Sequence, residues 1–367
     1  MLTIKTLNEN DDLVFEASVI CEYSRPWDSQ NFDIDRGRIT DEIIDEICSS
    51  EQNLKFGYKD EFESEFCFEH MLEDSLPKWM KEFIISDGDR HIRFKNGYLV
   101  LRSQVNIPKE KYLHALKSSE GEPIPADHFS DETLRSVYKN FVVSTLCDFS
   151  FLFSIAANIA KPGSIQFRTR YLVHDQELIK KTGGTLNFFE EAFEISKKYS
   201  WPPIECLNFS VVWNWLVNVP GFTLGESKTP LGRAIAALSY LLNDDYKDEE
   251  QLALVWALIG LESLYCSGSL NLKQQLMERS EIFLGSRPTF KKQFGHIYDF
   301  RSRLVHGDKN MHYKNFDPDP GNVFTDTLTE SESFAISTLI STLQKMSVNQ
   351  LYELNFRTIL QNNSSSP

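Results

Sequence analysis

Hydrophobic and polar positions alternate in the first part of the chain. Between Leu13 and Tyr23 the odd positions are apolar or aromatic, whereas Glu16, Ser18 and Glu22 occupy even positions. A period of two residues is typical of a strand with one buried face. The same alternation predicts further strands at residues 54–58, 62–68, 92–105 and 165–173, the third of these ranges forming a hairpin that turns at Asn96-Gly97. The pattern therefore predicts a sheet in the N-terminal part.

Apolar positions recur every three or four residues elsewhere, which predicts helices. These helices cover residues 39–47, 131–160, 188–199, 231–242, 249–266, 270–284, 287–306 and 327–346. Prolines and glycines between residues 220 and 230 mark a boundary before the last five helices. We therefore predict the α+β class: a mixed α/β N-terminal domain at residues 1–220, an all-α bundle at 221–350 and a C-terminal tail at 351–367.

One predicted helix is long enough to cross a membrane, because its second half, from Phe141 to Ala160, has the length of a span. Asp148 lies near its centre, where inserting a charge costs about 3 kcal/mol. We interpret the segment as a buried core helix and predict no membrane partner.

The formal net charge of −15 repels a polyanion at long range, so any nucleic-acid role must depend on a local site. Six cysteines are scattered without a CxxC pair, which favours free thiols in a reducing compartment and argues against a structural zinc site. The first residues show no secretion signal pattern. We therefore predict a cytoplasmic protein that uses no metal or other cofactor.

The candidate chemistry lies near the end of the helix at residues 287–306. Arg301 suits phosphate binding through its planar guanidinium, and His306 can exchange a proton near neutral pH. At 100° per residue, Arg301 lies on the apolar face of the helix, about 20° from Phe290, and His306 lies about 140° from Arg301. The two side chains can converge if the arginine stem reaches round, if the last turn loosens before Gly307, or if a second chain supplies one of them.

Charge also changes around this pair. Residues 231–310 hold ten Lys and Arg against ten Asp and Glu, a balance of zero in an acidic chain. Within residues 287–309 the basic residues number six against two acidic ones, and they are Arg287, Lys291, Lys292, Arg301, Arg303 and Lys309. On the apolar helix at 249–266, Glu262 needs a partner if it is buried, and Arg301 and Arg279 are the candidates.

Three segments carry a resemblance to a known family: residues 257–265 (ALIGLESLY), 278–284 (ERSEIFL) and 298–307 (YDFRSRLVHG). In this order and at these distances they resemble the HEPN superfamily, and more narrowly the Apea-like HEPN domains of prokaryotic defence proteins. The family's Arg-x4–6-His motif falls on Arg301 and His306, and its helix-two glutamate falls on Glu262. Many catalytic members carry Asn, Asp or His after the arginine. This chain has Ser302, as the Apea-like branch often does.

The resemblance implies a helical domain that forms a homodimer and places two Arg-x4-His motifs in one cleft. It implies a metal-independent endoribonuclease in which the ribose 2′-hydroxyl attacks the adjacent phosphate. Arg301 would bind the scissile phosphate, His306 would act as general base or acid, Tyr298 and Ser302 would orient the site, and Glu262 would hold Arg301. The expected RNA-binding residues are Arg303, Lys309, Arg287, Lys291 and Lys292.

Two other interpretations stay open: a non-catalytic HEPN module that binds RNA, a nucleotide or a partner protein, and a purely structural ion pair between Arg301 and Glu262. We favour the ribonuclease, because the structural pair gives no reason for the local basic surplus. The family also suggests a toxin-like role in antiviral or stress defence. The N-terminal domain would then sense a phage or host trigger or restrain the nuclease.

Overall fold

The computed structural model describes residues 13–24, 34–49, 52–56, 62–85, 97–107, 131–174, 177–183, 188–242, 250–285, 290–308 and 323–356. The predicted first arm of the hairpin at residues 92–96 lies outside these ranges, as do Arg287 and Lys309.

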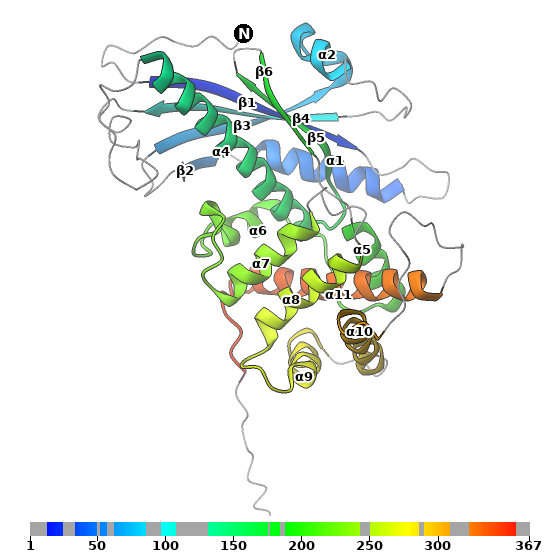
Figure 1. Ribbon diagram of the computed structural model, residues 1–367. Helices are drawn as coiled ribbons and strands as arrows, with labels where there is room; N and C mark the ends of the chain where they lie inside the picture. Colours follow the sequence, from blue (N-terminus) through cyan, green and yellow to red (C-terminus); the bar gives the residue numbers. More distant parts are fainter. Residues whose placement is uncertain are drawn as a thin grey trace, which may run out of the picture.

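The N-terminal part forms one antiparallel sheet of six strands in the order β2-β3-β4-β1-β5-β6 (Figure 1). The strands are β1 (Leu13–Ser24), β2 (Gln52–Phe56), β3 (Phe62–Leu72), β4 (Gly97–Ile107), β5 (Gln166–His174) and β6 (Glu177–Gly183). Strand β6 was not predicted, because its sequence, ELIKKTG, has little apolar alternation. The sheet itself confirms the mixed character predicted for this part.

The prediction that β1 has one buried face is wrong. Val19 and Cys21 lie in the main core on one side, whereas Ile20, equally buried, lies in a second apolar cluster on the other. Met80 of α2 (Lys78–Ile85) belongs to this second cluster. Strand β1 lies between β4 and β5, and a covering element on each face removes both sets of its side chains from water.

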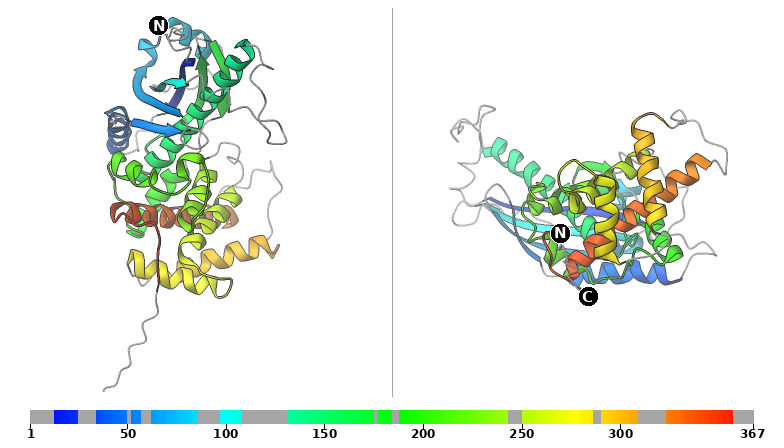
Figure 2. Two further views of the ribbon diagram at one scale, coloured as in Figure 1. Left: turned by 90° about the vertical axis from the view of Figure 1, so that its left-hand side faces the viewer. Right: turned by 90° about the horizontal axis from the view of Figure 1, so that it is seen from below.

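Two of the remaining helices lie against the sheet, and the others form a helical part that extends away from it (Figures 1 and 2). Their bounds are α1 (Ile34–Ser49), α4 (Asp131–Ala160), α5 (Phe188–Tyr199), α6 (Phe209–Leu216), α7 (Pro230–Leu241), α8 (Glu250–Tyr265), α9 (Leu272–Leu284), α10 (Phe290–Val305) and α11 (Val323–Val348). Helix α4 runs along the sheet and ends among the other helices (Figure 1). This arrangement confirms the α+β class.

Within α4, the window Val143–Ala160 is long and apolar enough to span a membrane, yet most of it is buried inside the protein. Phe153 stacks on Trp213 of α6 with ring centroids 4.2 Å apart. Phe68 of β3 contacts the Phe153 ring in an edge-to-face arrangement. The window therefore contributes aromatic side chains to the main core, as expected for a core helix.

Helix α11 forms the centre of the helical part, because it contacts α4, α5, α6, α8, α9 and α10. Its residues from Ser331 to Gln344 are all buried. Three of its contacts, those with α4, α5 and α6, reach elements that precede residue 220, the predicted domain boundary. The main core is correspondingly continuous from the sheet to α11.

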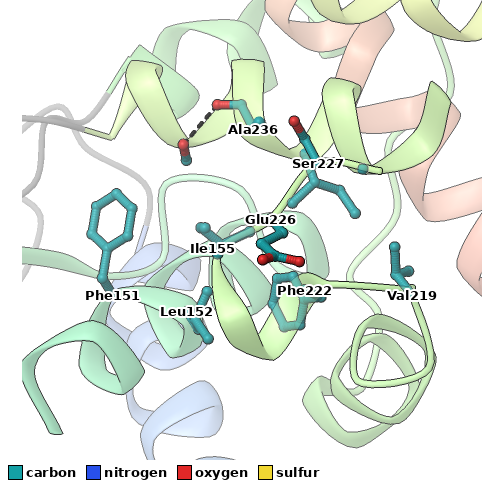
Figure 3. A pocket seen from close by; sticks show the side chains of 12 residues that line it. Phe151, Leu152, Ile155, Val219, Phe222, Glu226, Ser227 and Ala236 are labelled. Carbon is teal, nitrogen blue, oxygen red and sulfur yellow. Dashed lines mark hydrogen bonds between the residues drawn. The ribbon is translucent and has the colours of Figure 1, made fainter. Parts of the chain in front are cut away.

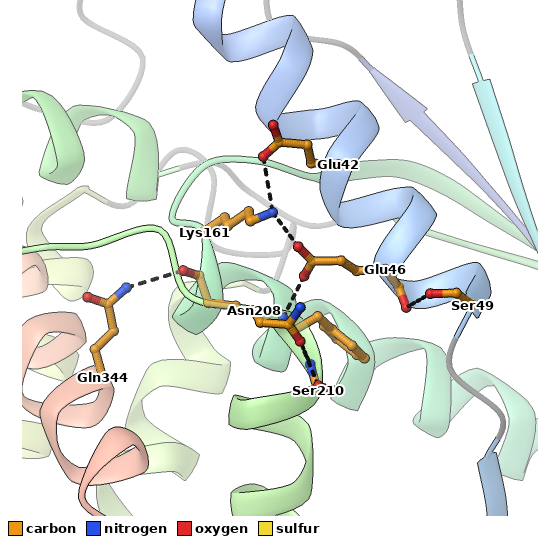
Figure 4. A network of polar contacts seen from close by, with 9 residues as sticks. Glu42, Glu46, Ser49, Lys161, Asn208, Ser210 and Gln344 are labelled. Atoms are coloured by element: carbon orange, nitrogen blue, oxygen red, sulfur yellow. Dashed lines mark hydrogen bonds and ion pairs between the residues drawn. The ribbon is translucent and has the colours of Figure 1, made fainter.

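A buried polar network joins α1 to the end of α4 (Figure 4). Lys161 is only 4% exposed and contacts Glu46 at 2.7 Å and Glu42 at 3.4 Å. The second oxygen of Glu46 accepts the backbone N–H of Phe209, which opens α6, at 2.6 Å. On α11, the Gln344 amide donates to the carbonyls of Ile159 and Glu205. Every charge in the network thus has a partner, and the network ties sheet and helices together.

Candidate functional site

The end of α10 fixes the position of His306. The backbone N–H of Asp308 donates to the carbonyl of Arg303 at 2.8 Å, and that of Gly307 donates to Leu304 at 3.3 Å. Gly307 has a φ of 76°, in the left-handed region that glycine adopts without strain. This is the Schellman arrangement that closes a helix. It leaves His306 as the last residue before the turn, with its side chain exposed to solvent.

Arg301 lies five residues earlier and is half buried. Its neighbours on α10 confirm the predicted apolar face, because Phe294, Ile297 and Leu304 are all buried. The Nε atom of Arg301 is shielded from solvent and has no hydrogen-bond partner. A shielded N–H group without a partner costs free energy, so packing rather than a hydrogen bond holds Nε in place, and a further acceptor would have to bind through the Nη atoms.

Glu262 of α8 does not form the expected ion pair with Arg301. Its Oε1 instead accepts a hydrogen bond from the hydroxyl of Tyr298 at 2.9 Å. The other candidate partner, Arg279 of α9, donates to the carbonyl of Tyr265 at 2.6 Å and so caps the end of α8. The sequence identified the carboxylate that needs a partner, but not the phenol one turn before Arg301 that supplies it.

Tyr298 links Glu262 and Arg301 electrostatically. Partial burial and the bond to the Glu262 carboxylate raise the pKa of Tyr298 to about 12, while the nearby Arg301 charge lowers it. The pKa of Cys266, at the end of α8, is raised to about 11 by burial and by Glu262. Both groups are therefore neutral at physiological pH, so the Tyr298 hydroxyl keeps its proton and donates a hydrogen bond to Glu262.

A surface ion pair flanks this cluster. Lys273 of α9 contacts Asp299 of α10 at 2.6 Å, and both side chains are more than a third exposed. The pair holds the N-terminal end of α9 against α10, and it neutralises the acidic residue nearest to Arg301 along the helix. Local positive charge around Arg301 is therefore preserved.

The structure describes only some of the predicted RNA-binding side chains. Arg303 is exposed, with its guanidinium 3.5 Å from the carbonyl of Asp308. Of Lys291 and Lys292 the structure describes the helical backbone alone. Ser302 is half buried, and its carbonyl accepts the N–H of His306 at 3.0 Å. Arg301, Tyr298 and Glu262 thus form one cluster, beside which Ser302 and His306 follow on the last turn.

The site offers a guanidinium for an anion and an exposed imidazole for proton transfer. Among the described residues, no group of three or more His, Cys, Asp or Glu side chains is arranged to hold a metal ion. The chemistry available from these side chains is anion binding together with acid–base catalysis.

Comparison with models of known families found no match, and comparison with curated proteins and with solved structures found no similar chain.

Proposed function

We propose that this protein is a metal-independent endoribonuclease whose C-terminal helices form a HEPN-type bundle. The observation that carries the proposal is the state of Arg301: a half-buried guanidinium, with a shielded Nε that has no partner, five residues before the exposed His306. Arg279, by contrast, uses its guanidinium within the fold, because its Nη1 donates to the carbonyl of Tyr265. Support also comes from the three segments that resemble the family.

In the proposed reaction, Arg301 binds the scissile phosphate and stabilises the charge of the pentacoordinate transition state. The imidazole of His306 removes the proton of the ribose 2′-hydroxyl. A bond then forms between O2′ and phosphorus while the bond between phosphorus and O5′ breaks. A protonated imidazole donates to the leaving O5′. The products are a 2′,3′-cyclic phosphate end and a free 5′-hydroxyl, with no net consumption of protons.

The proposed reaction needs a base and an acid, whereas one protomer offers one imidazole at the end of α10. A homodimer through the C-terminal helices would bring two arginines and two histidines to one site, because a two-fold axis repeats the same surface. Light scattering at micromolar concentration tests this part of the proposal. A monomer would contradict the composite site.

The decisive experiment incubates single-stranded RNA with the full chain in EDTA and identifies the new ends. We expect cleavage with cyclic phosphate ends, and its loss in His306→Ala. The matched control is His296→Ala, which removes another exposed imidazole from the same helix and should cleave normally. Equal cleavage by His306→Ala and wild type would contradict the proposal.

The second candidate is a non-catalytic HEPN module that binds RNA, a nucleotide or a partner protein. One observation favours it: within the described residues, no side-chain hydrogen bond orients the imidazole of His306, although catalytic histidines are commonly held by a partner. RNA binding that depends on Arg301, without cleavage and without dependence on His306, would support this candidate.

We further propose that the sheet domain senses a trigger or restrains the nuclease, as part of host defence in the cytoplasm. Because α5 and α6 cover α11, removing residues 1–220 would expose core surface. The role is therefore better tested in the full chain. Substitutions at the exposed edge of the sheet should change the toxicity of the expressed protein, and unchanged toxicity throughout would argue against this role.

A further inference from the structure

A small apolar pocket lies between α4 and α7, well separated in sequence from the cluster around Arg301 (Figure 3). Its volume is about 130 Å³. Buried Ile155, Val219, Phe222 and Ile235 contribute to the lining. An engineered apolar cavity of about 150 Å³ is large enough to bind benzene. A single six-membered ring is therefore the size of ligand that this pocket can hold.

The lining has one charged group. Among the described residues around the pocket, Glu226 is the one ionisable side chain, and Figure 3 shows it beside Phe222 and Ile155. The backbone holds Glu226 in place, because its N–H donates to the carbonyl of Gly221 at 2.8 Å. Gly221 has a φ of 85°, and an added Cβ would lie 2.6 Å from the carbonyl oxygen of Glu226. This tight turn fixes the backbone of Glu226 at the edge of the pocket.

Glu226 can exchange its present partner at little cost. It pairs with Lys228, and the two side chains are 49% and 62% exposed. An ion pair this exposed contributes little to stability, so a ligand cation that is partly shielded by the pocket can replace Lys228. The hydroxyl of Ser239 donates to the carbonyl of Ala236 at 2.6 Å, which leaves its oxygen as an acceptor. The Glu226 carboxylate and the Ser239 oxygen therefore both favour a ligand that donates hydrogen bonds.

We propose that this pocket binds a small amine that carries one ring or a short branched alkyl group. The ring would lie against Ile155, Phe222 and Ile235, and the ammonium would bind Glu226. Because the lining joins α4, which runs along the sheet, to α7 of the helical part, such a ligand would bridge the two parts of the chain.

Benzylamine, benzyl alcohol and benzoate test the proposal, because they share one ring and differ in charge. Methyl NMR spectra of the full chain should show shifts at Leu152, Ile155 and Ile235 on adding benzylamine. We expect a dissociation constant of about 1 mM for a ligand of so few atoms. Benzyl alcohol should bind roughly threefold more weakly, and benzoate weaker still.

Two variants separate the apolar and ionic parts of the site. Ala236→Phe should fill the pocket and abolish binding of all three compounds, with Ala236→Leu as the smaller change if the first does not fold. Glu226→Gln should remove the preference for benzylamine over benzyl alcohol. Absence of these methyl shifts with benzylamine, binding that survives a folded Ala236 variant, or equal binding of benzoate would overturn the proposal. None of these readouts depends on RNA cleavage.

Discussion

Two cations near helix ends show how a structural charge differs from a candidate functional one. Lys161, at the end of α4, is almost fully buried and contacts two carboxylates. Arg301, near the end of α10, is half buried, and its Nε has no partner at all. Glu262, the carboxylate expected beside Arg301, bonds Tyr298 instead. Removing one partner from a buried ion pair destabilises the fold, whereas removing a cation whose shielded donor has no partner loses no hydrogen bond at that atom.

The largest expected effect is on RNA cleavage by Arg301→Met, which retains most of the apolar stem and removes the guanidinium. We expect cleavage to fall about 10³-fold, the usual loss when a donor to transition-state charge is removed. Stability in urea should change by less than about 1 kcal/mol, because Nε has no partner to lose. The control is Arg303→Met, an exposed arginine two residues on, which should reduce cleavage far less. Equal losses in both variants would show a general effect of charge.

For Lys161→Met we expect a large loss of stability and no change in RNA cleavage. Removing this cation leaves Glu46 on α1 facing the end of α4 without its ionic partner, and breaking a buried pair costs about 3 kcal/mol. Urea unfolding should report that loss, while the rate of RNA cleavage per folded molecule should not change. Adding Glu46→Gln to Lys161→Met should recover part of the stability, since it removes the unpaired charge. A single variant as stable as wild type would contradict the structural role of Lys161.

Arg301 and Lys161 also differ in how far the sequence could predict their surroundings. Local periodicity gave α4 with the bounds that the structure has, and it placed Arg301 on the apolar face of α10, where it is half buried. The ion pairs of Lys161 could not be predicted from local pattern, because its partners lie 115 and 119 residues earlier. The burial of both faces of β1 likewise depends on α2, more than fifty residues further along the chain.

Tyr298→Phe tests the hydrogen bond that gives Glu262 a partner other than Arg301. The substitution removes the hydrogen bond to Glu262 and leaves its carboxylate without this donor, so we expect a loss of about 1 kcal/mol in urea unfolding. The matched control is Tyr352→Phe: that exposed ring stacks on Trp215 and is not part of the cluster. A loss in the control as large as in Tyr298→Phe would show that the hydrogen bond contributes nothing specific.

Alkaline pH offers a second measurement of the same bond. The pKa of Tyr298 is about 12 in the folded protein against an ordinary value of 10.0, so the folded state holds this proton more tightly than the unfolded state. The resulting stabilisation is fully present below pH 10 and is lost as the pH rises towards 12. Stability should therefore fall less steeply across this interval in Tyr298→Phe than in wild type. Parallel curves would contradict the raised pKa.

The smallest effect is expected for Lys273→Met, which breaks the ion pair with Asp299 on the surface between α9 and α10. Both side chains are more than a third exposed, so solvent screens their attraction and the loss should be about 0.3 kcal/mol. The free Asp299 carboxylate would then lie near Arg301 on the same helix, and cleavage should fall several-fold because the local positive charge is reduced. Asp299→Asn in the same chain should restore cleavage. These two variants distinguish an effect of local charge from an effect of helix stability, because RNA cleavage is expected to change several-fold while the free energy of unfolding hardly changes.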